Sequence, residues 1–238
     1  MKIKEVGFVI SLVQYKDYDA MVNVLTKNGK IAFKARGILK PTSKNAPSCQ
    51  LFCLSEFIIN QNQNRNTLIN AASIKKVKNL IENPKLATYL SFLSEIINKS
   101  EEKFSPYYFE YFNQLIDLFN EGYNDLLTLT LITLTRVMEN EGIGLNVDEC
   151  SICGNKEEIT TVSYENGGFL CYKCSNNIDD EVDYLKYFRY TVLANIDNVS
   201  KFSVPIEVGK KLLREYFDYI ENSIGVFYRH RKVLEMIF

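Results

Sequence analysis

The chain has 238 residues, of which 46% are hydrophobic, and its formal net charge is −1. This length and apolar content allow one large domain or two modest domains and exclude wholesale disorder. No apolar run approaches the roughly 18 residues of a membrane span, so we expect a cytoplasmic protein with reduced cysteines. Residues 1–20 start basic and apolar but lack a small-residue cleavage site, which favours a first strand over a signal peptide.

The charge is distributed very unevenly along the chain. Residues 1–78 contain thirteen Lys or Arg and four Asp or Glu, a net charge of +9, whereas the remaining 160 residues carry −10. A basic segment of this kind favours contact with a polyanion, and nucleic acid fits better than a membrane surface because no amphipathic helix accompanies the charge. A solvated basic surface is the alternative.

Residues 1–78 have the alternation and turn signals of β-strands. Asn28-Gly29 marks a hairpin, and Phe33 has the opposite parity to Lys34 and Arg36, so we expect Phe33 in the core. Five strands joined by short turns fit a small closed barrel such as the OB-fold, with an SH3-like barrel as the alternative. The predicted strands cover residues 5–13, 20–26, 31–36, 49–59 and 66–77, and the polar stretch 60–66 joins the last two.

From about residue 80 the hydrophobic period becomes helical. Asn83-Pro84, Ser105-Pro106 and Asn124 are predicted to begin three helices, and glycines at 122, 142 and 144 to end the second and third. Further helical segments are expected over 182–196, 205–224 and 226–238. The fold class is therefore α+β and multidomain, with an N-terminal OB-fold barrel over 1–79 and a helical domain over 80–238.

Four of the six cysteines follow the spacing C-x2-C-x17-C-x2-C, at Cys150, Cys153, Cys171 and Cys174. This is a four-cysteine zinc pattern, and it predicts one structural Zn²⁺ per chain in an inserted module at residues 148–177. Gly154 suits the knuckle after the first pair, and a hairpin turning at residues 166–167 would return the second pair to the first. A redox pair or a catalytic zinc fits less well, because four thiolates leave no open position.

The other two cysteines, Cys49 and Cys53, are expected to be buried reduced thiols on one face of the fourth strand with Leu51. We find no P-loop, Rossmann glycine pattern or nucleophile elbow, so we do not expect an enzyme. The only histidine, His230, is expected at the surface. The acidic run 179–181 is expected to cap a helix.

A basic barrel followed by a helical domain with a four-cysteine site resembles the RecO family of recombination mediator proteins. The N-terminal match is carried by "GFVISLVQYKDYDAMVNVLTKNGKIAFKARGILKPTSK". Within it the family-like residues are Gly7, Tyr15, Asp19, Thr26, Gly29, Lys30, Ile31, Lys34, Arg36, Gly37 and Ser43. The stretches "ENEGIGLNVDECSICG" and "YFDYIENSIGVFYRHRKVLEMIF" are similar to the entry into the zinc module and to the final helices.

The resemblance implies a bacterial DNA repair protein that binds single- and double-stranded DNA and anneals complementary strands. It also implies partners: RecR, the acidic and apolar C-terminal tail of the single-stranded DNA-binding protein (SSB), and the RecA recombinase. It implies a cytoplasmic, nucleoid-associated location. For the tail, Arg136 or the pair Arg229 and Arg231 are the candidate receptors of its carboxylates.

The residue chemistry suits DNA backbone contact. Such binding is independent of sequence and sensitive to salt. Because Phe33 is expected in the core, base stacking is not expected from it. The predicted DNA-binding residues are Lys30, Lys34, Arg36, Lys40 and Lys44. The alternatives are an RNA- or transcription-associated module without annealing activity, and a protein–protein adaptor.

Overall fold

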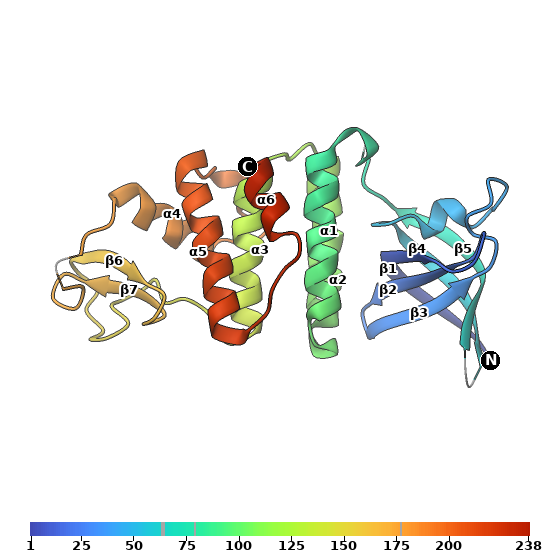
Figure 1. The fold of residues 1–238 in the computed structure, drawn as a ribbon, viewed down its shortest axis with the longest axis horizontal. Coiled ribbons are helices and arrows are strands. Elements are labelled where there is room, and N and C mark those ends of the chain that lie inside the picture. The colour runs from blue at the N-terminus through green and yellow to red at the C-terminus, as the bar shows by residue number, and fades with distance from the viewer. Residues whose placement is uncertain (63–64, 79, 177) are drawn as a thin grey trace. The chain divides into compact units, whose positions relative to one another are not determined.

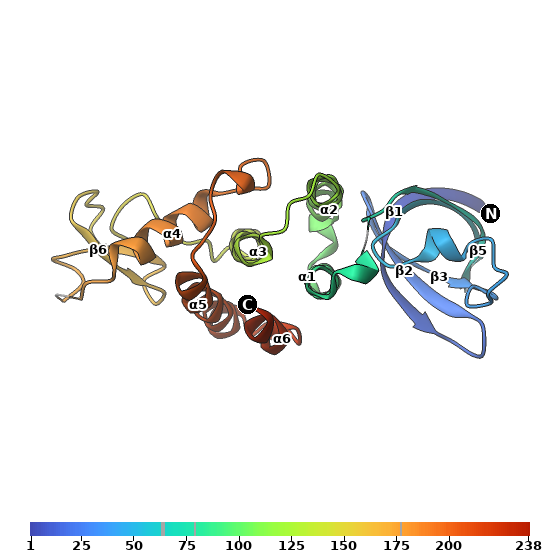
Figure 2. The ribbon, with the colours of Figure 1, turned by 90° about the horizontal axis from the view of Figure 1, so that it is seen from above.

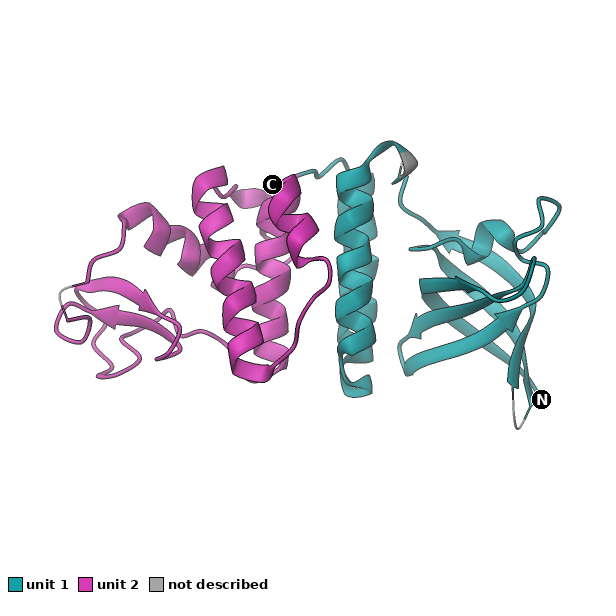
Figure 3. Cartoon of the chain, in the orientation of Figure 1, with its two compact units in different colours: residues 1–124 teal, residues 125–238 magenta. Residues whose placement is uncertain are grey.

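The computed structural model describes residues 1–62, 65–78, 80–176 and 178–238. They form two compact units, residues 1–124 and residues 125–238 (Figure 3). In the described residues, the first unit contains a barrel and two α-helices, and the second contains four α-helices and a two-stranded sheet (Figure 1). None of the helices in this described part is long and apolar enough to span a bilayer.

The strands of the first unit close into a barrel in the order β1-β2-β3-β5-β4. All neighbouring strands pair antiparallel except β3 and β5, which meet in parallel at Lys34 and Thr67. This closed barrel confirms the predicted OB-like fold. The strands are β1 (Lys2–Gln14), β2 (Ala20–Thr26), β3 (Gly29–Ala35), β4 (Leu54–Asn62) and β5 (Arg65–Lys75).

Alternation along the strands fills the barrel with apolar side chains. Val22, Val24, Phe33 and Ile59 are fully buried, and the rings of Phe33 and Phe57 lie 5.2 Å apart. Each such burial stabilises the fold by about 1.5–3 kcal/mol. Phe33 is therefore in the core as expected, and its neighbours on β3 face the outside of the barrel.

The start of the fourth strand was predicted wrongly. The first residue of the predicted strand, Cys49, belongs instead to a 3-10 helix (Ala46–Cys49), and β4 begins only at Leu54. Pro47 favours this helical turn, and Phe52 adopts a left-handed conformation with φ of 65°, which ends any extended run. Leu51 is 43% exposed and does not share a strand face with the cysteines.

The two isolated cysteines are free and buried, as expected. Burial, with a further contribution from Cys53, raises the pKa of Cys49 to about 12, so it stays a thiol. The sulfur of Cys53 lies 3.3 Å from the Ser55 hydroxyl and 3.1 Å from the Ser73 hydroxyl. Both cysteines are therefore thiols packed in the interior of the first unit.

The β2–β3 hairpin forms one residue earlier than the sequence suggests. Thr26 pairs with Gly29, so Lys27 and Asn28 make the turn, and Gly29 is the first residue of β3 with φ of 141°. In the predicted polar connection 60–66, residues 63 and 64 lie outside the described residues. So do residue 79, at the predicted domain boundary, and residue 177, at the end of the predicted module.

Two helices pack on the barrel within the first unit. Asn83 caps α1 (Pro84–Lys99) by accepting a hydrogen bond from the Leu86 N–H, as predicted. The helix α2 (Ser105–Asn120) includes Ser105 rather than being capped by it. Its Phe112 ring lies 4.8 Å from that of Phe8 on β1. Figure 2 shows α1 and α2 beside one another, next to the barrel strands. The domain division at 79 and 80 stays a prediction.

The second unit is built around the buried helix α3 (Leu126–Asn140). Asp125, rather than Asn124, caps it by accepting from the Thr128 N–H at 3.0 Å. Gly209 allows α5 to approach α3 closely, because a Cβ there would lie 2.6 Å from Leu127. The other elements are β6 (Ile159–Ser163), β7 (Gly168–Cys171), α4 (Val182–Leu193), α5 (Ile206–Ile224) and α6 (Arg231–Ile237).

Candidate functional site

The cysteine cluster is formed by two knuckles that the β6–β7 hairpin brings together. In the first knuckle, the Gly154 N–H donates to the Cys150 carbonyl at 2.9 Å, and Gly154 has φ of 72°, as expected. In the second, the Cys174 N–H donates to the Cys171 carbonyl at 2.9 Å. The hairpin turns through Gly167, with φ of 73°, close to the predicted turn.

The four sulfur atoms have the spacing of a tetrahedral metal site. The Sγ atoms of Cys150, Cys153, Cys171 and Cys174 all lie within 4.8 Å of one another. The Cys153 and Cys171 sulfurs are 3.7 Å apart. Four sulfurs at about 2.3 Å from one ion would be separated by about 3.8 Å, so the set fits a closed tetrahedral site.

The surroundings of the cluster stabilise negative charge at one sulfur. Burial raises the pKa of Cys150, but backbone hydrogen bonds from Cys171, Cys153 and Ile152 outweigh it and lower the pKa to about 6. Hydrogen bonding to Cys153, followed by burial, raises the pKa of Cys174 to about 12. Thiolates packed this closely repel one another, so a cation is the natural partner of the set.

The acidic run before α4 supports the hairpin and does not cap the helix, which corrects the capping prediction. Asp180 accepts from the Thr161 hydroxyl at 2.6 Å and from the Val162 N–H at 3.1 Å, both on β6. Glu181, at the N-cap position of α4, makes no side-chain cap hydrogen bond. The Asp180 carboxylate therefore ties β6 to the segment that follows the hairpin.

Two tyrosines and one carboxylate join the hairpin that carries the four cysteines to the helices of the second unit. Glu215 on α5 accepts from the Tyr184 hydroxyl of α4 at 2.5 Å and from the Tyr164 hydroxyl at 3.1 Å. Burial, together with these neighbours, raises the pKa of both tyrosines, so both remain neutral donors. This network fixes the hairpin on α4 and α5.

The second candidate site is a basic face on the outside of the barrel. Lys34 on β3 is half-buried and forms an ion pair with Asp19 at 2.8 Å. The hydrogen bond from Lys34, reinforced by the Gly37 N–H, lowers the pKa of Asp19. Arg36, Lys40 and Lys44 follow along the chain and are exposed. Four of the five predicted DNA-binding residues thus lie on one segment of the chain, residues 34–44, and three of these four are exposed.

The fifth predicted DNA-binding residue, Lys30, contacts the end of α1. Its ammonium donates to the carbonyls of Ile97 at 2.9 Å, Asn98 at 3.3 Å and Ser100 at 2.8 Å, at the C-terminus of α1. Positive charge at that end also matches the helix dipole. Burial lowers the pKa of Lys30. The side chain ties β3 to α1 within the first unit.

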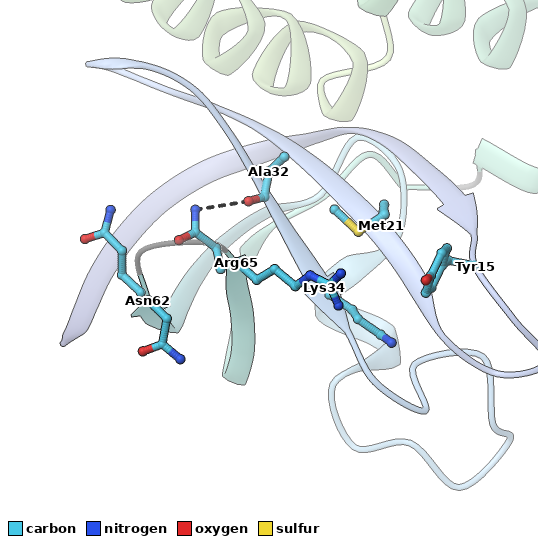
Figure 4. Close-up of a pocket in the computed structure, with 8 residues that line it drawn as sticks. Tyr15, Met21, Ala32, Lys34, Asn62 and Arg65 are labelled. Atoms are coloured by element: carbon cyan, nitrogen blue, oxygen red, sulfur yellow. Dashed lines mark hydrogen bonds between the residues drawn. The ribbon is translucent and has the colours of Figure 1, made fainter.

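The basic face contains residues that sequence reasoning missed. A pocket of about 530 Å³ is lined by Tyr15, Met21, Lys34 and Arg65, among others (Figure 4). A shallower hollow of about 490 Å³ lies along Tyr18, Arg36 and Lys40. The tyrosines stand among charges between two predicted strands, a signal that could have identified them. Arg65 is brought to Lys34 only by the closure of the barrel between β3 and β5.

Two of the three arginines that were candidates for binding the acidic SSB tail already contact carboxylates within the second unit. Arg136 donates to the Val192 carbonyl and pairs with Glu139 at 2.7 Å. Arg231 contacts the carboxylates of Asp218, Glu221 and Glu235 at 2.7, 2.7 and 2.8 Å. Burial lowers the pKa of Arg231, but these three partners outweigh it and raise the pKa above its ordinary value.

A pocket lined mainly by basic and apolar residues lies beside the pair of Arg231 and Glu235. It has a volume of about 460 Å³ and lies between α5 and α6. Its lining residues are Lys210, Leu213, Arg214, Lys232, Glu235 and Met236.

Comparison with known proteins identifies the family of the chain. The family model described as "Recombination protein O N terminal" matches residues 1–77, and "Recombination protein O C terminal" matches residues 81–232. The proteins named DNA repair protein RecO from Bacillus cytotoxicus and from Bacillus cereus strain AH187 are each 28% identical over 241 residues. In both cases the match covers 97% of this chain and 96% of the relative. The chain therefore belongs to the RecO family of recombination proteins.

Proposed function

We propose that the chain binds single- and double-stranded DNA through its barrel and anneals complementary strands. With RecR, it would help load RecA onto SSB-coated single strands, in the cytoplasm at the nucleoid. The observation that carries this proposal is the exposed basic face on the OB-like barrel of a RecO-family chain. The protein would act by binding alone, without catalysis.

The proposed contact uses Lys34, Arg36, Lys40, Lys44 and Arg65. Ammonium and guanidinium groups there would neutralise successive phosphates, which gives affinity without sequence preference. We leave Lys30 out of the contact set because three carbonyls at the C-terminal end of α1 already accept hydrogen bonds from its ammonium.

The metal proposed for the cysteine cluster is a single structural Zn²⁺, held by Cys150, Cys153, Cys171 and Cys174. Four thiolate ligands leave no position for water or substrate, so the ion would supply folding free energy and no reaction chemistry. The hairpin it closes has a small apolar cluster of its own, centred on Leu170 and the buried cysteines.

For the SSB tail, we propose the pocket between α5 and α6. Lys210, Arg214 and Lys232 can receive carboxylates, while Met236, which is 76% exposed, offers apolar surface to the end of the tail. This choice replaces Arg136 and Arg231, whose guanidinium groups already contact carboxylates of the same unit.

The DNA contact is tested by Lys34→Ala with Arg36→Ala, measured by fluorescence anisotropy on oligonucleotides of several sequences. Loss of two phosphate contacts should weaken binding to every sequence alike and reduce the salt slope on single strands by roughly 1.4. Lys2→Ala with Lys85→Ala removes the same charge from exposed positions of the first unit and serves as the control. A loss confined to one sequence, or an equal loss in the control, would contradict the proposed contact.

A further inference from the structure

The connection between β1 and β2 exposes two tyrosines beside the basic face. Tyr15 is 44% exposed and Tyr18 is 52% exposed, although both belong to the first unit, which has an extensive aromatic core. Single exposed aromatic residues are ordinary on protein surfaces. Two within four residues, next to two hollows lined by cations, need a more specific explanation.

The connection is held in a fixed conformation. The Tyr15 N–H donates to the Asp19 carbonyl at 2.7 Å, and the Leu39 N–H donates to the Tyr18 carbonyl at 3.0 Å. The side-chain amide of Gln14 donates to the Asp17 carbonyl at 3.2 Å. Since these bonds hold the connection at the Tyr15 N–H and at the Tyr18 carbonyl, ordering its backbone on binding costs little entropy.

Each ring lies next to ammonium groups. The Lys34 ammonium lies over the Tyr15 ring, 4.8 Å from its centre, and that of Lys40 lies over the Tyr18 ring, 5.6 Å from its centre. A base that stacks on either ring would displace the ammonium from the ring face, and the phosphate of that nucleotide would then lie within reach of the same lysine. Figure 4 shows Tyr15 at the edge of the pocket that also contains Lys34 and Arg65.

We propose that Tyr15 and Tyr18 are base-stacking residues that make this face favour unpaired strands over duplex. This proposal rests on the proposed DNA-binding function. Bases in a duplex are stacked on one another and cannot be reached by a tyrosine ring, whereas bases of a single strand offer a free face. The lysines and arginines bind the phosphates of single strands and of duplex alike. The tyrosines add affinity only for the single strand.

The chain contains no tryptophan, which allows a direct test. Tyr15→Trp and Tyr18→Trp each place one tryptophan at the proposed stacking position. Oligo-dT should quench its fluorescence, and an abasic strand with the same phosphates should bind with much less quenching. Phe227→Trp, at a 65% exposed position in the second unit, should not respond to either strand.

Tyr15→Ala with Tyr18→Ala supplies an independent measurement by anisotropy. Single-strand affinity should fall at least about fivefold while duplex affinity stays unchanged and Tyr→Phe at both positions retains binding. Equal losses on both DNA forms, or equal quenching by oligo-dT and abasic strands, would overturn the stacking role. Wild-type protein that binds neither form would instead overturn the proposed function itself.

Discussion

At the residue scale, the strand β3 shows that similar lysines can have different tasks. Lys30 and Lys34 both project from the barrel, yet Lys30 contacts three carbonyls at the end of α1 and Lys34 lines the basic pocket. Parity along the strand predicted that both leave the core. It could not predict which lysine meets a helix, because that helix lies about 67 residues further along the chain.

We predict that Lys30→Met lowers the free energy of unfolding by about 1–3 kcal/mol, because carbonyls at the end of α1 lose a charged donor. DNA affinity at neutral pH should stay within about twofold, since no phosphate contact is lost. Chemical denaturation and anisotropy measure the two effects, with Lys85→Met as the exposed control. Unchanged stability together with weaker DNA binding would contradict this prediction and show that Lys30 contacts DNA.

At the scale of elements, the hairpin that carries the four cysteines was largely predictable from the sequence, whereas the contacts that support it were not. The spacing of the four cysteines, Gly154 and the turn near Gly167 each have a local physical reason, and the structure brings the four sulfurs together. The role of Asp180 was missed because it depends on β6, which lies 18 residues earlier in the chain. A local acidic run resembles a helix cap until the distant partner is known.

We predict about one zinc per chain by metal analysis, and lower thermal stability together with loss of that zinc in Cys153→Ser. The matched control is Ile152→Ser, on the same knuckle, whose side chain is exposed and provides no ligand. DNA binding by the first unit should survive in the fraction of Cys153→Ser that stays folded. Native protein that is fully folded without any metal would refute the structural role.

At the scale of the whole molecule, periodicity and composition were sufficient for the order of barrel, helices and hairpin. They were insufficient where the chain departs from its local pattern. The fourth strand was predicted five residues too early, because Pro47 and the left-handed Phe52 turn an apolar run into a 3-10 helix and a bend. The face formed by Tyr15, Lys34 and Arg65 needed barrel closure, which no local pattern contains.

The central proposal is most directly tested by fluorescence-monitored annealing of complementary strands, naked and coated with SSB, at low salt with the metal bound. We predict acceleration on both substrates, with loss of both in Lys34→Ala with Arg36→Ala. Lys210→Glu with Arg214→Glu, or SSB without its tail, should remove only the acceleration on coated strands. No acceleration of naked strands by the wild-type protein would contradict the proposed function.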